Sequence, residues 1–202
     1  MKRVALLVTG KAEEALHQSL KRLFPEAEFI MLPRRDGFTS AALPPAPVLH
    51  TLGKAPRPTN IERLAAALVA EVEPGRRDQK PPDLVVLIDD LELVNEAWPE
   101  RAIEHVRAAV RAHLERHPWP SAAARERAYE RVCERCSFHV LAPMVEAYFY
   151  AEPAALTRAG ARRPSLVDAA ASDVERFVVD DAAFLGPPDR PSGVALPVWA
   201  IA

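Results

Sequence analysis

The sequence lacks a long apolar run, has only two cysteines, and contains none of the short motifs that mark several large enzyme classes. Without about 18 consecutive apolar residues no segment can span a bilayer, so no membrane association is predicted. Two cysteines are too few for a disulfide framework and are typical of a cytoplasmic protein. The P-loop, GxSxG, HExxH and GxGxxG patterns are absent, which argues against a P-loop ATPase, a serine hydrolase, a zincin and a dinucleotide enzyme.

An excess of charge of one sign is also missing, because 26 basic residues face 28 acidic ones and the net charge is −2. No overall field therefore attracts nucleic acid or an anionic membrane. The basic residues gather in expected loops, at Arg34-Arg35, Lys54 and Arg57, Arg76-Arg77 with Lys80, and Arg162-Arg163. They serve solubility alone, or they line one edge of a sheet and receive a polyanion; the sequence leaves both interpretations open.

Strands and helices are expected to alternate along the chain. We expect strands at residues 3–9, 27–32 and 84–88, with an amphipathic helix at 11–24 and another that begins after Thr59 or Asn60. The charged, very short apolar start at Met1–Gly10 indicates a strand rather than a signal peptide. This order predicts an α/β fold with a mainly parallel central sheet of four or five strands and helices on both faces.

The remainder of the chain is expected to be mostly helical additions to this sheet. Helices are predicted at 99–116, from Ser121 to about Cys136, at 144–151 and from a capping box at Ser172, with a short strand at 138–141. The proline-rich loop at 33–58 is too long for a simple connector, so it is functional or mobile. We expect one domain at 1–160 and a helical and extended segment at 161–202 packed on it.

The most informative segment is an apolar run that ends in acid. Leu84–Ile88 is typical of a strand buried on both faces, and Asp89, Asp90 and Glu92 follow it. Ligands of open α/β sheets bind at the carboxyl ends of the strands, and hard divalent cations take carboxylate oxygens. The segment predicts a metal site, although a solvated acidic loop explains the same residues.

Three further carboxylates are candidates for the same site. Glu13 and Glu14 stand in the first turn of the expected helix at 11–24, which opens at the same sheet edge as Asp89 if the strands are parallel. They also fit a helix N-terminus without any ligand. Glu146 lies in an apolar stretch, where a carboxylate must be paired, protonated or bound to metal.

Three segments together resemble the Toprim family. Leu6–Ala15 is similar to the family's opening, in which a strand ends in Glu-Gly and a helix begins with another Glu. Val85–Glu92 resembles the second motif, a strand that ends in Asp-x-Asp. Phe138–Leu156, with its Val-Glu-Ala-aromatic core, resembles the third signature as found in small bacterial relatives of the Toprim/OLD nucleases. The resemblance rests on the order and spacing of these motifs.

The resemblance implies a Rossmann-like, Toprim-like sheet and phosphodiester chemistry that depends on Mg²⁺ or Mn²⁺. It implies a nuclease acting on nucleic acid, encoded with a partner ATPase and linked to phage or mobile-element defence. The catalytic residues it implies are Glu13, Asp89, Asp90 and Glu146, and the metal ligands are Asp89, Asp90, Glu92 and Glu13.

Two departures from the family pattern keep other functions open. Thr9 stands where the family has its first Glu and cannot act as an anionic ligand. The residue two places after Asp89 is Leu91, so the Asp-x-Asp spacing is displaced. The alternatives are a catalytically degenerate interaction subunit that binds the ATPase, which the apolar tail around Trp199 also favours, and a sensor that binds a nucleotide at the same edge. The sequence does not determine the oligomeric state.

A second group of residues has the types that zinc prefers. Cys133, Cys136 and His139 follow His113 and His117, which share one helix face. No glycine turn separates the two cysteines, which lie at an expected helix end. We therefore expect the cysteines to behave as small, partly buried apolar residues and not as zinc ligands.

Overall fold

The computed structural model describes residues 1–48, 54, 57–73, 81–142 and 153–158. Their contacts divide the chain into two compact units, Met1–Ala142 and Pro143–Ala202. In the second unit the described residues form helix α7 (Pro153–Arg158), and the predicted domain boundary after residue 160 falls within this unit. The predicted helix at 144–151, Glu146, the capping box at Ser172 and the tail around Trp199 lie outside the described residues.

The first unit is built on a four-stranded parallel sheet. Its strands are β1 (Lys2–Val8), β2 (Ala27–Met31), β3 (Leu84–Asp90) and β4 (Cys136–Leu141), in the spatial order β2-β1-β3-β4. All three pairings are parallel. The predicted α/β, Rossmann-like fold with a parallel central sheet is confirmed.

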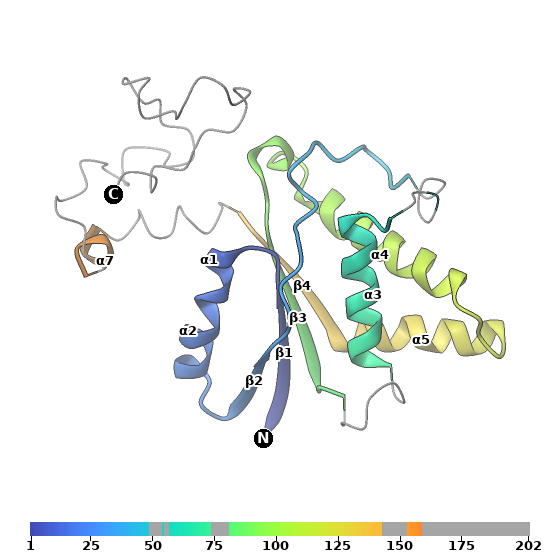
Figure 1. The fold of residues 1–202 in the computed structure, drawn as a ribbon, viewed down its shortest axis with the longest axis horizontal. Coiled ribbons are helices and arrows are strands. Elements are labelled where there is room, and N and C mark those ends of the chain that lie inside the picture. Colours follow the sequence, from blue (N-terminus) through green and yellow to red (C-terminus); the bar gives the residue numbers. More distant parts are fainter. Residues whose placement is uncertain (49–53, 55–56, 74–80, 143–152, 159–202) are drawn as a thin grey trace. The chain divides into compact units, whose positions relative to one another are not determined.

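Helices lie on both sides of this sheet (Figure 1). Helices α1 (Lys11–Glu14) and α2 (Leu16–Leu23) lie on one side, and α3 (Asn60–Val72), α4 (Pro99–Arg116) and α5 (Ala122–Arg135) lie on the other. The main core forms between β1, β3 and the second group of helices. Its largest fully buried side chains there are Leu7, Leu64, Val72, Val85, Leu87 and Leu114.

The single helix expected at 11–24 is wrong in two respects. It is divided at Ala15, and the apolar face of this amphipathic helix does not stay buried, since Leu23 is 70% and Phe24 47% exposed. The reason is the position of α2, which packs chiefly on β2, the edge strand, so that part of its apolar face has no neighbour among the described residues. Phe24 instead contacts the ring of Phe29.

Strand pairing extends two elements beyond their predicted ends. The apolar run predicts an end of β3 at Ile88, but Asp89 and Asp90 continue the strand by pairing with Val140 and Leu141. β4 begins at Cys136 rather than Phe138 for the same reason. The acidic residues therefore belong to the end of a strand, where alternation fixes the direction of each side chain.

Local sequence signals set the helix starts. The Ser121 hydroxyl accepts a hydrogen bond from the Ala124 N–H at 3.1 Å, which confirms the predicted cap of α5. Thr59 precedes α3 as predicted, and Glu62 Oε2 accepts from both its N–H and its hydroxyl at 2.9 Å. None of the described helices is both long and apolar enough to cross a membrane.

Candidate functional site

The strand order creates a topological switch point between β1 and β3. From β1 the chain crosses to β2 on one side, and it then returns over the opposite face of the sheet to β3 on the other side of β1. The two connections diverge there, and open α/β sheets bind their ligands outside the carboxyl ends of such strands. Thr9 follows β1 directly and Asp89 lies near the end of β3, so both stand at this point.

The switch point gathers two carboxylates around one hydroxyl. The Thr9 hydroxyl donates a hydrogen bond to Asp89 Oδ1, and its oxygen lies 3.4 Å from Glu13 Oε1. Thr9 and Asp89 come together because Val8 pairs with Ile88, which aligns the next residue of each strand. Glu13 reaches them from the first turns after β1, in α1. We call Glu13 and Asp89 the carboxylate pair.

Both carboxylates are removed from water, since each residue is only 2% exposed. Among the described residues no group hydrogen bonds to Asp89 Oδ2. Burial raises the pKa of Asp89 from 3.8 to about 6, and the charges of Glu13 and Glu92 add to the increase. Hydrogen bonds from Thr9 and the Phe38 backbone oppose this increase in pKa. A buried acceptor without a donor, beside a second carboxylate, is a position that favours a cation or a proton.

Two glycines let backbone pass close to the carboxylate pair. A Cβ atom on Gly10 would overlap Glu13 Oε2, and one on Gly37 would lie 2.9 Å from Asp89 Oδ1. Both approaches are closer than real Cβ contacts, so any larger residue forces the carboxylate or the backbone to shift. Glycine at position 37 allows the loop after β2 to lie against Asp89, and glycine at position 10 leaves room for the Glu13 carboxylate.

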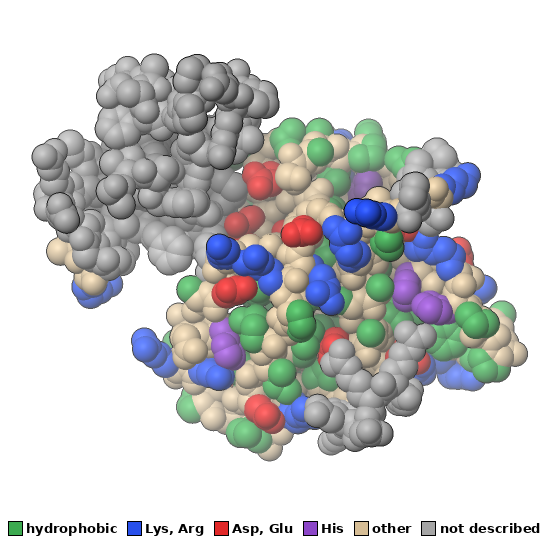
Figure 2. All heavy atoms as spheres, in the orientation of Figure 1, with side chains coloured by type: hydrophobic (Ala, Val, Ile, Leu, Met, Phe, Trp, Pro, Cys, Tyr) green, Lys and Arg blue, Asp and Glu red, His purple; other side chains and the backbone are tan. Residues whose placement is uncertain are grey.

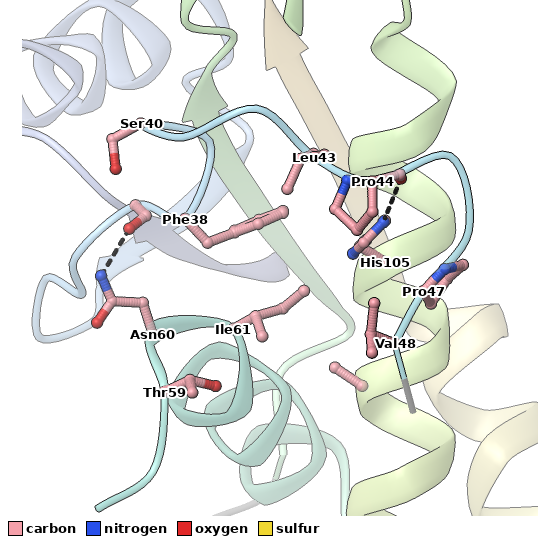
Figure 3. A pocket seen from close by; sticks show the side chains of 12 residues that line it. Phe38, Ser40, Leu43, Pro44, Pro47, Val48, Thr59, Asn60, Ile61 and His105 are labelled. Atoms are coloured by element: carbon pink, nitrogen blue, oxygen red, sulfur yellow. Dashed lines mark hydrogen bonds between the residues drawn. The ribbon is translucent and has the colours of Figure 1, made fainter. Parts of the chain in front are cut away.

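The loop after β2 is held over the site by side chains whose role no local sequence pattern reveals. Asn60 Nδ2 donates to the Gly37 carbonyl at 2.8 Å, and His105 Nε2 lies 3.1 Å from the Pro44 carbonyl (Figure 3). The same segment lines a hollow of about 400 Å³ with the start of α3 and with α4. Part of the long loop at 33–58 thus has a defined place beside the site.

Asn95 fastens the middle of this loop. Its amide donates to the Thr39 carbonyl at 2.6 Å and to the Ala41 carbonyl at 3.1 Å, and its Oδ1 accepts from the Leu43 N–H at 2.8 Å. Asn95 is 3% exposed and belongs to a 3-10 turn, η2 (Leu93–Asn95). No local pattern identifies such a residue, because its partners lie more than fifty positions away.

Not every predicted site residue joins the carboxylate pair. Asp90 follows Asp89 within β3, so its side chain points to the opposite face of the sheet. Glu92 is half-buried beyond the strand end, and its charge acts on Asp89. Glu14 is exposed and pairs with Arg34 at 3.6 Å. Within the described residues no three His, Cys, Asp or Glu side chains gather as a metal cluster.

The cysteines and histidines of the second predicted group occupy three elements. The expectation that both cysteines are partly buried is wrong for Cys133, which is exposed on α5. Cys136 begins β4, where burial raises the pKa of its thiol to about 12. His139 Nε2 lies 2.8 Å from the Ser137 hydroxyl. The rings of His113 and His117 meet edge to face, 4.6 Å apart, at the end of α4.

The donor chemistry of the carboxylate pair suits a divalent cation. Mg²⁺ takes oxygen ligands and is commonly bound by one or two carboxylates. Asp89 Oδ2 supplies a buried acceptor without a donor among the described residues, and Glu13 supplies a second anionic group. Thr9 adds a neutral oxygen between them.

Comparison with known proteins finds no matching family model, no matching curated protein and no matching solved structure. The Toprim resemblance therefore stays a prediction from the three motifs.

Proposed function

We propose that this protein is a metal-dependent phosphodiesterase that acts on nucleic acid in the cytoplasm, with Mg²⁺ or Mn²⁺ held by the carboxylate pair. The observation that supports it most is Asp89 Oδ2, a buried carboxylate oxygen without a donor among the described residues, placed beside Glu13 at the switch point of a parallel sheet. The Toprim-like order of motifs supports the same chemistry. A partner ATPase and a role in defence belong to this proposal on the resemblance alone.

Each residue of the site has a definite task in this proposal. A bound ion would polarise a phosphoryl oxygen and lower the pKa of a water molecule. Glu13 and Asp89 would hold the ion, and the Thr9 hydroxyl and the Phe38 N–H fix the orientation of Asp89. Asp90, Glu92 and Glu146 stay predicted contributors from the motifs.

Metal binding comes first among the tests. We expect calorimetry with Mn²⁺ to show a single saturable site in the wild type and none in Glu13→Gln/Asp89→Asn. Hydrolysis of labelled single- and double-stranded DNA and RNA should fall by about a hundredfold in the same variant. Glu14→Gln is the matched control, because Glu14 adjoins Glu13 but is exposed. Saturable binding without hydrolysis of any substrate would refute the phosphodiesterase and leave the metal site.

A second candidate is the non-catalytic interaction subunit that binds a partner ATPase. Two observations favour it: Thr9 occupies the position of the family's first acid, and Asp90 points away from Asp89. In this case Asp89 has only a structural role. It accepts hydrogen bonds from Thr9 after β1 and from the Phe38 backbone, and so holds the loop after β2 in place. The absence of any saturable metal binding by the wild type at millimolar Mn²⁺ would support this candidate.

Gly10→Ala tests the geometry of the site without removing a charge. The new Cβ would overlap Glu13 Oε2, so the carboxylate must move. We expect the affinity for Mn²⁺ to fall about tenfold, as when a supporting group of a metal site is lost. Calorimetry measures this, and thermal melting shows whether the variant folds. An unchanged affinity in a folded variant would show that the position of Glu13 does not matter for binding.

A further inference from the structure

Three arginines line a second hollow next to the carboxylate pair. The hollow has a volume of about 510 Å³ and lies between the loop after β2, α3 and α4. Figure 2 shows Lys and Arg side chains gathered near the middle of the face in view. The lining side chains are Arg34, Arg35, Asp36, Arg63, Ala66, Ala67, Ala70 and His113.

The positive charge of this hollow exceeds its negative charge. Arg34 pairs with Glu14 at 3.6 Å and Arg63 with Asp36 at 3.4 Å, both as largely exposed pairs. Such exposed pairs are weak and exchange readily with solvent or a ligand. Among the described residues that line the hollow, one is acidic, Asp36, and three carry a guanidinium group.

Arg35 is the residue that most needs an acceptor. It is half-buried, and within the described part of the chain no carboxylate pairs with its guanidinium. Its Nη1 donates to the Arg34 carbonyl at 3.4 Å, a long bond, while a guanidinium carries five N–H donors. A planar guanidinium that meets no carboxylate among the described residues suits a phosphate, which can accept two parallel hydrogen bonds.

Part of the lining of the hollow is apolar. Ala66, Ala67 and Ala70 of α3 supply it, at helical spacing on one side of the helix. An arginine-rich hollow with an apolar wall suits a phosphorylated ligand. The volume is in the range of pockets that hold small ligands.

The backbone connects this hollow to the carboxylate pair. The Arg35 N–H donates to the Val8 carbonyl at 3.1 Å, one residue before Thr9, and Gly37 closely approaches Asp89 two residues later. The segment from Arg35 to Gly37 therefore borders both sites. We propose that the hollow binds a phosphate of the substrate other than the one that is cleaved, so that the substrate is an oligonucleotide strand with at least two phosphates. This inference rests on the proposed function.

The test uses the full chain in EDTA, where metal cannot contribute. The probe is a fluorescein-labelled oligothymidylate of about a dozen nucleotides, followed by anisotropy, with pyrophosphate as competitor. We expect Arg35→Gln to weaken binding about tenfold and to lower the slope of log Kd against log salt by about 0.7, as for one lost contact to a single strand. Arg35→Lys should recover only part of the lost affinity, because lysine keeps the positive charge but cannot donate two parallel hydrogen bonds to one phosphate.

Arg127→Gln is the matched control, since Arg127 is an exposed arginine of α5 away from the hollow. The affinity of Arg127→Gln for the oligothymidylate should stay within about twofold of the wild-type affinity. Equal losses in Arg127→Gln and Arg35→Gln, no loss in Arg35→Gln, or no binding by the wild type would each overturn the inference. Arg35-dependent binding in a protein without a metal site would leave this inference standing and refute the phosphodiesterase. Hydrolysis that does not depend on Arg35 would refute this inference and leave the phosphodiesterase standing.

Discussion

Asp89→Asn is expected to raise the free energy of unfolding at about pH 8 by up to roughly 3 kcal/mol while it removes metal binding. Asn keeps the shape of Asp and can accept the same hydrogen bonds from Thr9 and the Phe38 N–H. It carries no charge, so the cost of burying an anion beside Glu13 disappears.

The sign of this effect follows from the direction of the shift in pKa. The pKa of Asp89 is about 6 in the folded protein and 3.8 when unperturbed, so the folded state binds more protons between these values. The resulting stability is fully present below about pH 4 and is lost as the pH rises to about 6. The difference of about two pH units, at 1.36 kcal/mol each, gives the upper limit stated above.

Urea unfolding in EDTA, from about pH 4 to pH 8, measures how the free energy of unfolding depends on pH. The wild type should lose stability across that range relative to Asp89→Asn, and Glu14→Gln should follow the wild type. Added Mn²⁺ should stabilise the wild type above about pH 6 and leave Asp89→Asn unchanged, because only the ionised carboxylate binds metal. Parallel pH profiles for the wild type and Asp89→Asn would contradict the prediction.

Arg116→Ala is expected to lower the free energy of unfolding by about 3 kcal/mol. Arg116 Nη1 donates to Glu62 Oε1 at 2.6 Å, and Glu62 is only 5% exposed. The other oxygen of Glu62 accepts from the N–H and hydroxyl of Thr59, so the pair joins the end of α4 to the start of α3. Removal of Arg116 takes a cation away from a buried carboxylate, which costs more than loss of a surface pair.

Arg107→Ala on the same helix is the control, because Arg107 is exposed. Arg107→Ala should change the free energy of unfolding by no more than about 0.5 kcal/mol. The double variant Glu62→Gln/Arg116→Ala should be more stable than Arg116→Ala alone, since Gln retains an acceptor for Thr59 and removes the buried charge. Equal losses in Arg107→Ala and Arg116→Ala would show that the pair contributes no more than surface charge.

The sheet could be predicted because its strands are chemically distinct from the segments around them. Residues 84–88 are apolar throughout, as expected for a strand covered on both faces, and the caps at Thr59 and Ser121 are local signals. The exposure of Leu23 and Phe24 was not predictable, because it depends on which neighbours α2 finds on an edge strand. The apolar stripe of α2 looks the same whether or not those neighbours exist.

Of the candidate site, the sequence identified the acids but not their arrangement. Asp89 and Asp90 both stand at the end of β3, yet Asp89 turns toward Glu13 and Asp90 does not, because side chains alternate along β3 and pairing with β4 carries the strand through Asp90. The roles of Gly37, Asn60 and Asn95 depend on contacts between segments far apart in the chain. Contacts between distant segments produce no local pattern in the sequence, so they cannot be predicted from it.

Apolar runs and capping residues act over a few neighbouring positions, so the alternation of strands and helices, the buried third strand and the acidic residues at its end could be read from the sequence. Which carboxylates meet depends on the folded chain. The order β2-β1-β3-β4 places the ends of β1 and β3 side by side, and the loop after β2 then covers Asp89 and excludes water from it. Burial and like charge raise the pKa of Asp89 only in that arrangement, since both require groups that are distant in the sequence.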